Sequence, residues 1–123
     1  MESFYVIRME SFVKNIEIEM SVLRDMIWEG ILPAISKQMI LESGSLSSVG
    51  DCGLEGTDEW KRHIARLAKA KIDLMEKTKE LVEMKERMSK LNLRKHADAL
   101  VHEAVPLMAE IRRIADSVEV YMS

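Results

Sequence analysis

The amino-acid sequence predicts an all-α fold, an antiparallel bundle of three to four long helices. The composition favours helix, because hydrophobic residues make up 47% of the 123 residues, aromatic residues only 5%, and Leu, Met, Ala, Glu and Lys abound. Apolar residues recur at spacings of three, four and seven along most of the chain, as in amphipathic helices. Since no helix of this kind buries its apolar stripe alone, we expect residues 1–123 to pack as one helical domain.

The first predicted helix covers residues 2–41. Its apolar stripe consists of Phe12, Val13, Ile16, Met20, Leu23, Ile27, Ile31 and Leu32, and it continues through Ile35, Met39 and Ile40. Gly30 and Pro33 interrupt this pattern. Because proline lacks an amide donor and clashes with the preceding turn, we expect this helix to be kinked or broken near Pro33.

A Gly/Ser-rich linker is predicted at about 42–57. Four of the five glycines and several serines fall in this segment, which is longer than most connections between helices. It also holds Cys52, the only cysteine of the chain. A lone cysteine next to Asp51 builds neither a disulfide framework nor a cysteine-based zinc site, so we interpret it as an incidental thiol.

The second predicted helix covers residues 58–90. Thr57 is expected to cap its first turn, where Asp58 and Glu59 suit the positive end of the helix dipole. Two rows of apolar residues, seven residues apart, are expected to form one broad buried face: Trp60, Leu67, Leu74, Leu81 and Met88 in the first row, and Ala68, Met75 and Val82 in the second.

The third predicted helix covers residues 93–121, after a break near residues 89–93. Its apolar residues alternate spacings of four and three, which is the seam of a coiled coil: Leu93, Ala97, Leu100, Ala104, Leu107, Ile111, Ile114, Val118 and Tyr121. Pro106 lies within this seam without interrupting it. We therefore expect one helix, bent locally at the proline.

The charge pattern disfavours nucleic-acid and membrane partners. The formal net charge is -3 and the pI is about 5.7, so the basic surface that binds a phosphate backbone is missing. No segment has the roughly 20 uninterrupted apolar residues of a membrane span. The single cysteine fits a reducing compartment, and we expect a cytoplasmic location.

No catalytic, cofactor-binding or metal-binding residues are predicted, and this chain is not expected to be an enzyme. His96 and His102 are six residues apart and point in different directions on a helix, so we expect His63, His96 and His102 to be partly exposed side chains without a metal. The carboxylates of residues 76–83 alternate with lysines. They are expected to form solvated pairs such as Glu83–Arg87 rather than an acid–base pair.

Three segments, in order, resemble the C-terminal helical region of type III glutamine synthetases. The first is Arg8-Met-Glu-Ser-Phe-Val-Lys-Asn-Ile-Glu-Ile-Glu19, followed by Val22-Leu23 and by Ile31-Leu-Pro-Ala34. The second is the central helix after a variable insertion. The third contains Ala97, Val105-Pro106, Met108, Glu110-Ile111-Arg112 and Ala115-Asp116. Together they span most of residues 8–120.

The resemblance implies a structural or interaction role. Glutamine synthetases ligate ammonia to glutamate with ATP and magnesium, but the family's catalytic domain and its aromatic, proline-rich tail are absent from this sequence, and none of the family's functional residues can be carried over. The expected partners are the rest of a parent polypeptide or its subunits, or a second copy bound through the apolar helix faces. The sequence leaves open whether the chain is an excised domain or a short native protein, and whether its first helix is domain-swapped.

Two alternatives remain open from the residues alone. The chain can be a free-standing helical adaptor or regulator produced from its own gene. It can also be a small helical enzyme of the chorismate mutase type, in which cationic side chains on long helices bind a dicarboxylate. Arg66, Lys71, Arg87 and Arg94 are the residues that would form such a cluster.

Overall fold

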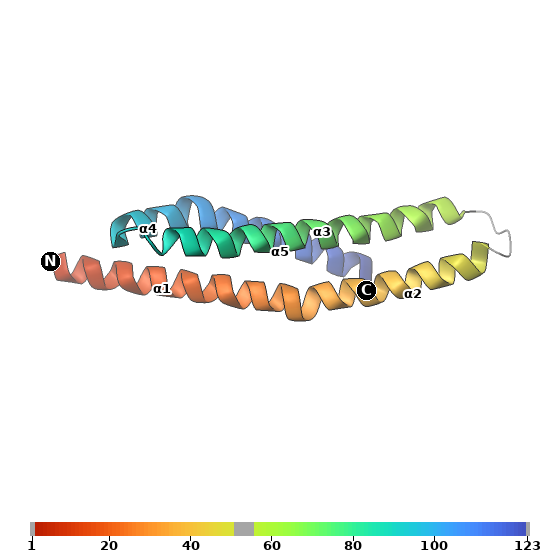
Figure 1. The fold of residues 1–123 in the computed structure, drawn as a ribbon, viewed down its shortest axis with the longest axis horizontal. Coiled ribbons are helices and arrows are strands. Elements are labelled where there is room, and N and C mark those ends of the chain that lie inside the picture. Colours follow the sequence, from red (N-terminus) through yellow and green to blue (C-terminus); the bar gives the residue numbers. More distant parts are fainter. Residues whose placement is uncertain (1, 51–55, 123) are drawn as a thin grey trace.

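The computed structural model describes residues 2–50 and 56–122, and these residues form three long helical rods (Figure 1). No β-strand occurs among them. The all-α prediction with three long helices is therefore confirmed. The first rod consists of α1 (Glu2–Met26), the π-helical turn η1 (Ile27–Ile31) and α2 (Leu32–Gly50). The second rod is α3 (Thr57–Met88). The third rod consists of α4 (Leu93–Ala99), the π-helical turn η2 (Leu100–Ala104) and α5 (Val105–Met122).

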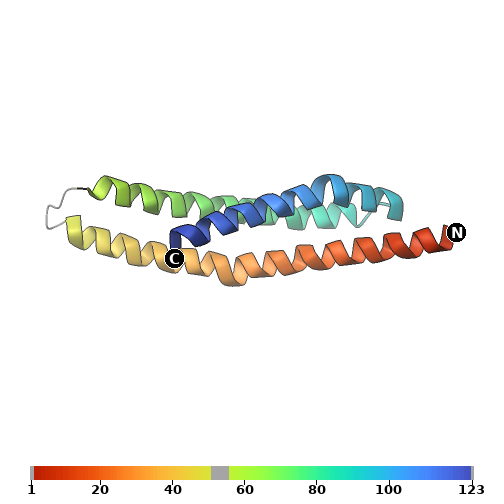
Figure 2. The same ribbon diagram turned by 180° about the vertical axis from the view of Figure 1, so that it is seen from behind.

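The rods lie side by side, and α3 runs antiparallel to the other two (Figures 1 and 2). The first rod is the longest, and α5 ends beside the early part of α2. Each rod therefore has a face toward the common core, and the grooves between neighbouring rods face outward.

The core is built from the apolar stripes that the spacing predicts. The first row on α3 is buried at Leu67, Leu74, Leu81 and Met88, which confirms that part of the prediction. Across from it lie buried residues of the first rod and of the third rod, among them Met20, Leu23, Ile27, Ile35, Leu100, Ala104, Leu107, Ile111 and Val118. The side chain of Tyr121, the last residue of the predicted seam, lies outside the described residues.

Each proline of the chain follows one π-helical turn by two residues. The amide of Leu32, just before Pro33, donates to the carbonyl of Ile27, five residues back, and the amide of Val105, just before Pro106, donates to Leu100 in the same way. In a regular α-helix, the proline ring clashes with the carbonyl four residues earlier. The wider turn displaces that carbonyl, so helical structure continues through both prolines.

The π-helical turns also keep the apolar stripes in line. Successive apolar residues four apart, such as Leu23, Ile27, Ile31 and Ile35, drift by about 40° per step around a helix of 3.6 residues per turn. One wider turn takes up an extra residue and reverses part of that drift. All four of these side chains are buried on the same side of the first rod.

The start of α3 differs from the sequence prediction. Thr57 is the first residue of the helix, not its cap, and the capping position belongs to Gly56, which makes no side-chain hydrogen bond. Gly56 has φ of 88°, in the left-handed region that favours glycine. Asp58 and Glu59 do lie in the first turn. The helix therefore begins after a glycine in the left-handed conformation, and not after a residue whose side chain caps the first turn.

Replacing Gly56 by alanine is expected to lower the free energy of unfolding by about 1 kcal/mol, because alanine is strained at this φ. The matched control is Gly44→Ala. Gly44 lies within α2, and an added Cβ there meets no atom within 4 Å, so this substitution is expected to raise stability by about 0.5–1 kcal/mol. Urea unfolding followed by circular dichroism compares the two, and changes of the same sign would contradict the assignment.

The predicted Gly/Ser-rich linker is largely helical in the structure. Residues 42–50 belong to α2 and residue 57 to α3, while the linker's residues 51–55, with Cys52, lie outside the described residues. Helix is retained because α2 packs along α3. Glu42 accepts hydrogen bonds from Trp60 Nε1 and, at 2.9 Å, from Gln38 Nε2. Tertiary packing thus overrides the weak helix propensity of glycine and serine.

A short turn separates α3 from the third rod. Leu91 N donates to the carbonyl of Met88 at 3.0 Å, and Asn92 then caps α4 by accepting from Lys95 N at 2.9 Å. The second helix therefore ends at Met88, two residues before the predicted end. The third rod starts at Leu93, where the sequence places it.

Candidate functional site

The three histidines lie apart from one another. His63 is on α3, His102 is exposed on η2, and His96 is on α4. Among residues 2–50 and 56–122, no group of three or more His, Cys, Asp or Glu side chains is placed to hold a metal ion. His96 corrects the expectation of a partly exposed side chain, because it is buried between the rods.

The burial of His96 comes from its contact with α1. Its Nε2 atom lies 3.1 Å from Glu17 Oε1, a distance that suits an ion pair, but the geometry does not make a hydrogen bond. The turn at residues 89–92 folds α4 back against α1 and so brings these two residues together. This contact ties the start of the third rod to the first rod.

The four cations considered for a dicarboxylate site do not form a cluster. Arg66 and Arg87 are both on α3 and are separated by about 30 Å at 1.5 Å per residue. Arg87 is paired with Glu103 on η2 at 3.2 Å, which replaces the predicted Glu83–Arg87 pair. The arrangement therefore offers no shared binding point for one small ligand.

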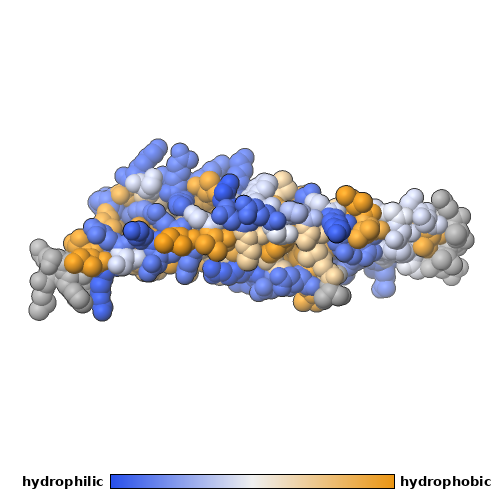
Figure 3. All heavy atoms as spheres, turned by 90° about the horizontal axis from the view of Figure 1, so that it is seen from below, coloured by the Kyte–Doolittle hydropathy of each residue, from blue (hydrophilic) through white to orange (hydrophobic). Residues whose placement is uncertain are grey.

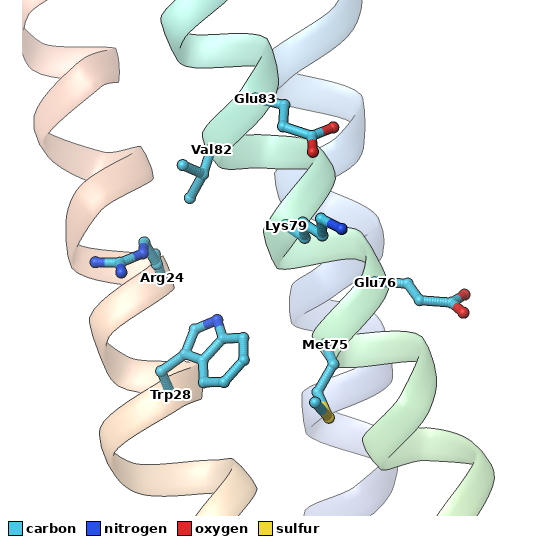
Figure 4. A pocket seen from close by; sticks show the side chains of 7 residues that line it. All are labelled: Arg24, Trp28, Met75, Glu76, Lys79, Val82 and Glu83. Carbon is cyan, nitrogen blue, oxygen red and sulfur yellow. The ribbon is translucent and has the colours of Figure 1, made fainter.

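One hollow on the described surface is a groove between the first rod, at α1 and η1, and α3. It has a volume of about 480 Å³, and Figure 4 shows Trp28, Met75 and Val82 projecting into it. These three side chains are 42%, 37% and 41% exposed. We refer to this feature as the Trp28 groove. Its members include two of the three residues from the second apolar row of α3, which was expected to be buried.

A second, smaller hollow extends the groove along the same pair of helices. It shares Arg24 and Val82 with the first and reaches Ser21 on α1 and Lys85 on α3. Lys85 Nζ donates to Ser21 Oγ at 2.7 Å and closes the groove at that end. The open part therefore runs from Lys85 to Met75, about 15 Å along α3.

The indole ring of Trp28 is held in place by a buried threonine. Trp28 Nε1 donates to Thr78 Oγ1 at 3.0 Å, and the Thr78 hydroxyl donates in turn to the carbonyl of Leu74 at 2.6 Å. Thr78 is fully buried and is one of two buried polar residues among the described ones. The chain of hydrogen bonds fixes the ring while 42% of the residue stays exposed, as in pre-organised interaction sites.

Charged side chains flank the groove on its two outer sides. Arg24 projects from α1 away from α3, whereas Glu76, Lys79 and Glu83 project from α3 away from α1 (Figure 4). Arg24 also contacts its neighbour Asp25 at 3.3 Å. Lys79 lies three residues after Glu76 and four before Glu83, so its charge is balanced within α3. Among the residues that line the main hollow, α1 therefore contributes one cationic side chain, and α3 contributes two acidic side chains and one lysine.

Sequence reasoning missed this site because its parts are far apart in the chain. Trp28 and Thr78 are 50 residues apart, and neither belongs to a recognised motif. One signal was available, however. Thr78 follows Leu74 by four residues, at a position where the apolar pattern of α3 calls for a hydrophobic residue.

On the opposite side of α3, Lys77 is paired with Glu110 of α5. Its Nζ atom lies 2.8 Å from Glu110 Oε1. The hydrogen bond to Glu110 raises the pKa of Lys77 above its usual 10.5, although partial burial works against this rise. A raised pKa means that the pair stabilises the fold below pH 10.5 and that the contribution is lost as the pH rises through the folded-state pKa.

Lys77→Met is therefore expected to lower the free energy of unfolding by about 0.5 kcal/mol at pH 7, since half-exposed ion pairs contribute little. The difference from the unsubstituted chain is expected to shrink as the pH rises above 10.5. Urea titrations at pH 7, 9 and 11 measure it. Lys69→Met, at an exposed position of the same helix outside the groove, serves as the control. A difference that stayed constant up to pH 11 would argue against the ion pair.

Within the part of the chain that the structure describes, no helix combines the length and the apolar character needed to cross a lipid bilayer. Comparison with known proteins adds no relative: the chain matches no family model, no curated protein and no solved structure.

Proposed function

We propose that this chain is a non-catalytic structural and interaction domain. The observation that supports this role is the amount of large apolar surface outside a well-filled core. Besides the Trp28 groove, the exposed apolar side chains include Ile7, Ile18, Val22 and Met26 on α1 and Ile40 and Leu41 on α2. Figure 3 shows apolar surface running along the first rod. Surfaces of this kind mark contacts with other proteins.

The proposal takes the chain to be similar to the C-terminal helical region of type III glutamine synthetases. Two segments that carry the resemblance, Ile31-Leu-Pro-Ala34 and Val105-Pro106, fall at the two junctions between a π-helical turn and a proline. This coincidence supports a structural role for both motifs. In the same proposal, η1 is the bend expected near Pro33.

In this role the chain takes no part in the chemistry of the parent ligase. The parent would join ammonia to glutamate with ATP and magnesium, using residues of a separate catalytic domain. The helical domain would supply packing surface, subunit contacts or a regulatory surface in the cytoplasm. Its partners would be the rest of the parent polypeptide or its subunits.

Deletion from a parent enzyme tests the proposal. The DNA flanking this coding segment is read for an in-frame catalytic domain, and residues 8–120 are then deleted from the full-length protein. We expect the deletion to reduce subunit assembly, measured by light scattering, and to lower glutamine formation as a consequence. A shortened parent that retains full assembly and activity would refute the assembly role.

Reading the flanking DNA also distinguishes the ligase-domain proposal from its main alternative, a free-standing adaptor. A free-standing adaptor predicts no catalytic frame beside this segment, whereas the ligase domain predicts one. Finding no such frame would favour the adaptor and would remove the glutamine synthetase setting from the proposal.

A further inference from the structure

We propose that the Trp28 groove binds the same groove of a second copy of this chain, with a two-fold axis parallel to the helices. The inference names a partner for the interaction domain and rests on that proposed function. It starts from a surface that is rigid, apolar and open: Trp28 held by Thr78, with Met75 and Val82 beside it. A fixed aromatic side chain at the centre of an apolar surface is typical of the energetic centre of an interface.

The register of α1 against α3 places the charges relative to the ring. Two hydrogen bonds define it, because Trp28 is level with Thr78 and Ser21 is level with Lys85. In an antiparallel pair, Arg24 is then level with Val82 and next to Glu83. The cationic side chain of one rim and an acidic side chain of the other thus stand at the same height along the groove.

The two rims decide how two copies can face each other. A two-fold axis perpendicular to the helices would lay α1 on α1 and α3 on α3 and reverse positions along the groove, so that Arg24 would meet α1 of the partner and not the acidic residues of α3. A two-fold axis parallel to the helices lays α1 of each copy on α3 of the other. Each residue then keeps its position along the helix axis in both copies, and Arg24 of each copy reaches Glu83 of its partner. Charge complementarity therefore selects the second arrangement.

The same arrangement completes the packing at the groove. It brings four helices together, α1 and α3 from each copy, with every neighbouring pair antiparallel, as in an up-and-down four-helix bundle. The two Trp28 rings meet near the axis, at the level of Thr78. Because the open groove is only about 15 Å long, we expect a weak dimer, with a dissociation constant on the order of 10 μM.

The full 123-residue chain is tested by sedimentation velocity and light scattering from about 1 to 500 μM, a range that brackets this constant. We expect a monomer–dimer equilibrium. Val82→Glu places a charge in the groove and is expected to raise the dissociation constant by at least tenfold. Ile18→Glu, the same change on the outer face of α1, is expected to leave it within about threefold. Circular dichroism checks that both variants fold.

A charge exchange tests the orientation. Arg24→Glu alone and Glu83→Arg alone each place like charges across the proposed interface twice, so each variant is expected to dimerise at least tenfold more weakly. An equimolar mixture restores opposite charges at both contacts and is expected to dimerise like the unsubstituted chain. Arg113→Glu, an exposed residue on α5, is the control for the change in net charge.

Three results would overturn the inference. They are a monomeric chain throughout the concentration range, a dimer that Ile18→Glu weakens while Val82→Glu does not, and a mixture of the two charge variants that stays monomeric. A monomeric isolated chain leaves the proposed function to the deletion experiment on the parent enzyme. The two proposals therefore fail separately.

Discussion

Replacing Leu74 by alanine is expected to lower the free energy of unfolding by about 3 kcal/mol. Leu74 is fully buried at the middle of α3, with Leu67 and Leu81 on the same row and both other rods packed on that face. Truncating a buried leucine removes its apolar contacts and leaves a cavity that the surrounding helices fill only in part, which costs 2–5 kcal/mol in general. Urea or thermal unfolding measures the loss.

Met75→Ala is the matched control, one residue along the same helix. Met75 is 37% exposed at the edge of the Trp28 groove, so its truncation is expected to cost less than about 1 kcal/mol. In a chain that dimerises through this groove, the comparison is made at a protein concentration well below the dissociation constant. Equal losses for the two substitutions would mean that the two rows of α3 are buried alike, against the structure.

The different environments of these two rows mark a limit of sequence reasoning. The spacing of seven residues identifies both rows, because periodicity is a local property of a helix. The width of the buried face depends on how many helices pack on α3 and at which angles. With two neighbouring rods, Leu74 and Leu81 are covered, while Met75 and Val82 stay at the rim. A fourth helix would be needed to cover them.

The boundaries of the first rod show a second limit. Glycine and serine in residues 42–50 predict a linker, and proline at position 33 predicts an interruption of the helix. Both predictions rest on the intrinsic helix propensity of these residues. In the structure, Trp60 and Gln38 bond to Glu42, and a π-helical turn makes room for Pro33. Tertiary contact therefore overrides the weak helix propensity of residues 42–50, and a one-turn change of helix type lets helical structure continue through Pro33.

The candidate site could not be derived from the sequence, because it depends on pairings between distant residues. Trp28 meets Thr78 only because the first rod and α3 lie antiparallel in one particular register. His96 is buried only because the turn after α3 folds α4 onto Glu17. Local patterns report that a helix exists and which side is apolar. Local patterns carry no information about the register of two helices whose contacting residues are 50 positions apart in the sequence.

Replacing Trp28 by alanine is expected to lower the free energy of unfolding by about 2 kcal/mol, measured at low concentration on the monomer. The indole is more than half buried between α1 and α3, and its loss removes both that contact and the hydrogen bond to Thr78. Trp28→Phe separates the two contributions, because phenylalanine keeps much of the apolar contact but cannot donate. We expect Trp28→Phe to cost about 1 kcal/mol.

A double-mutant cycle with Thr78→Val isolates the hydrogen bond. Thr78→Val keeps the shape of the side chain, removes the acceptor of Trp28 Nε1 and is expected to cost about 1 kcal/mol, because the indole N–H then lacks its protein partner. The combined Trp28→Phe and Thr78→Val variant is expected to cost no more than either change alone, a coupling of about 1 kcal/mol between the residues. Costs that simply add would show that Thr78 does not hold the ring. The rigidity on which the Trp28 groove depends would then need another cause.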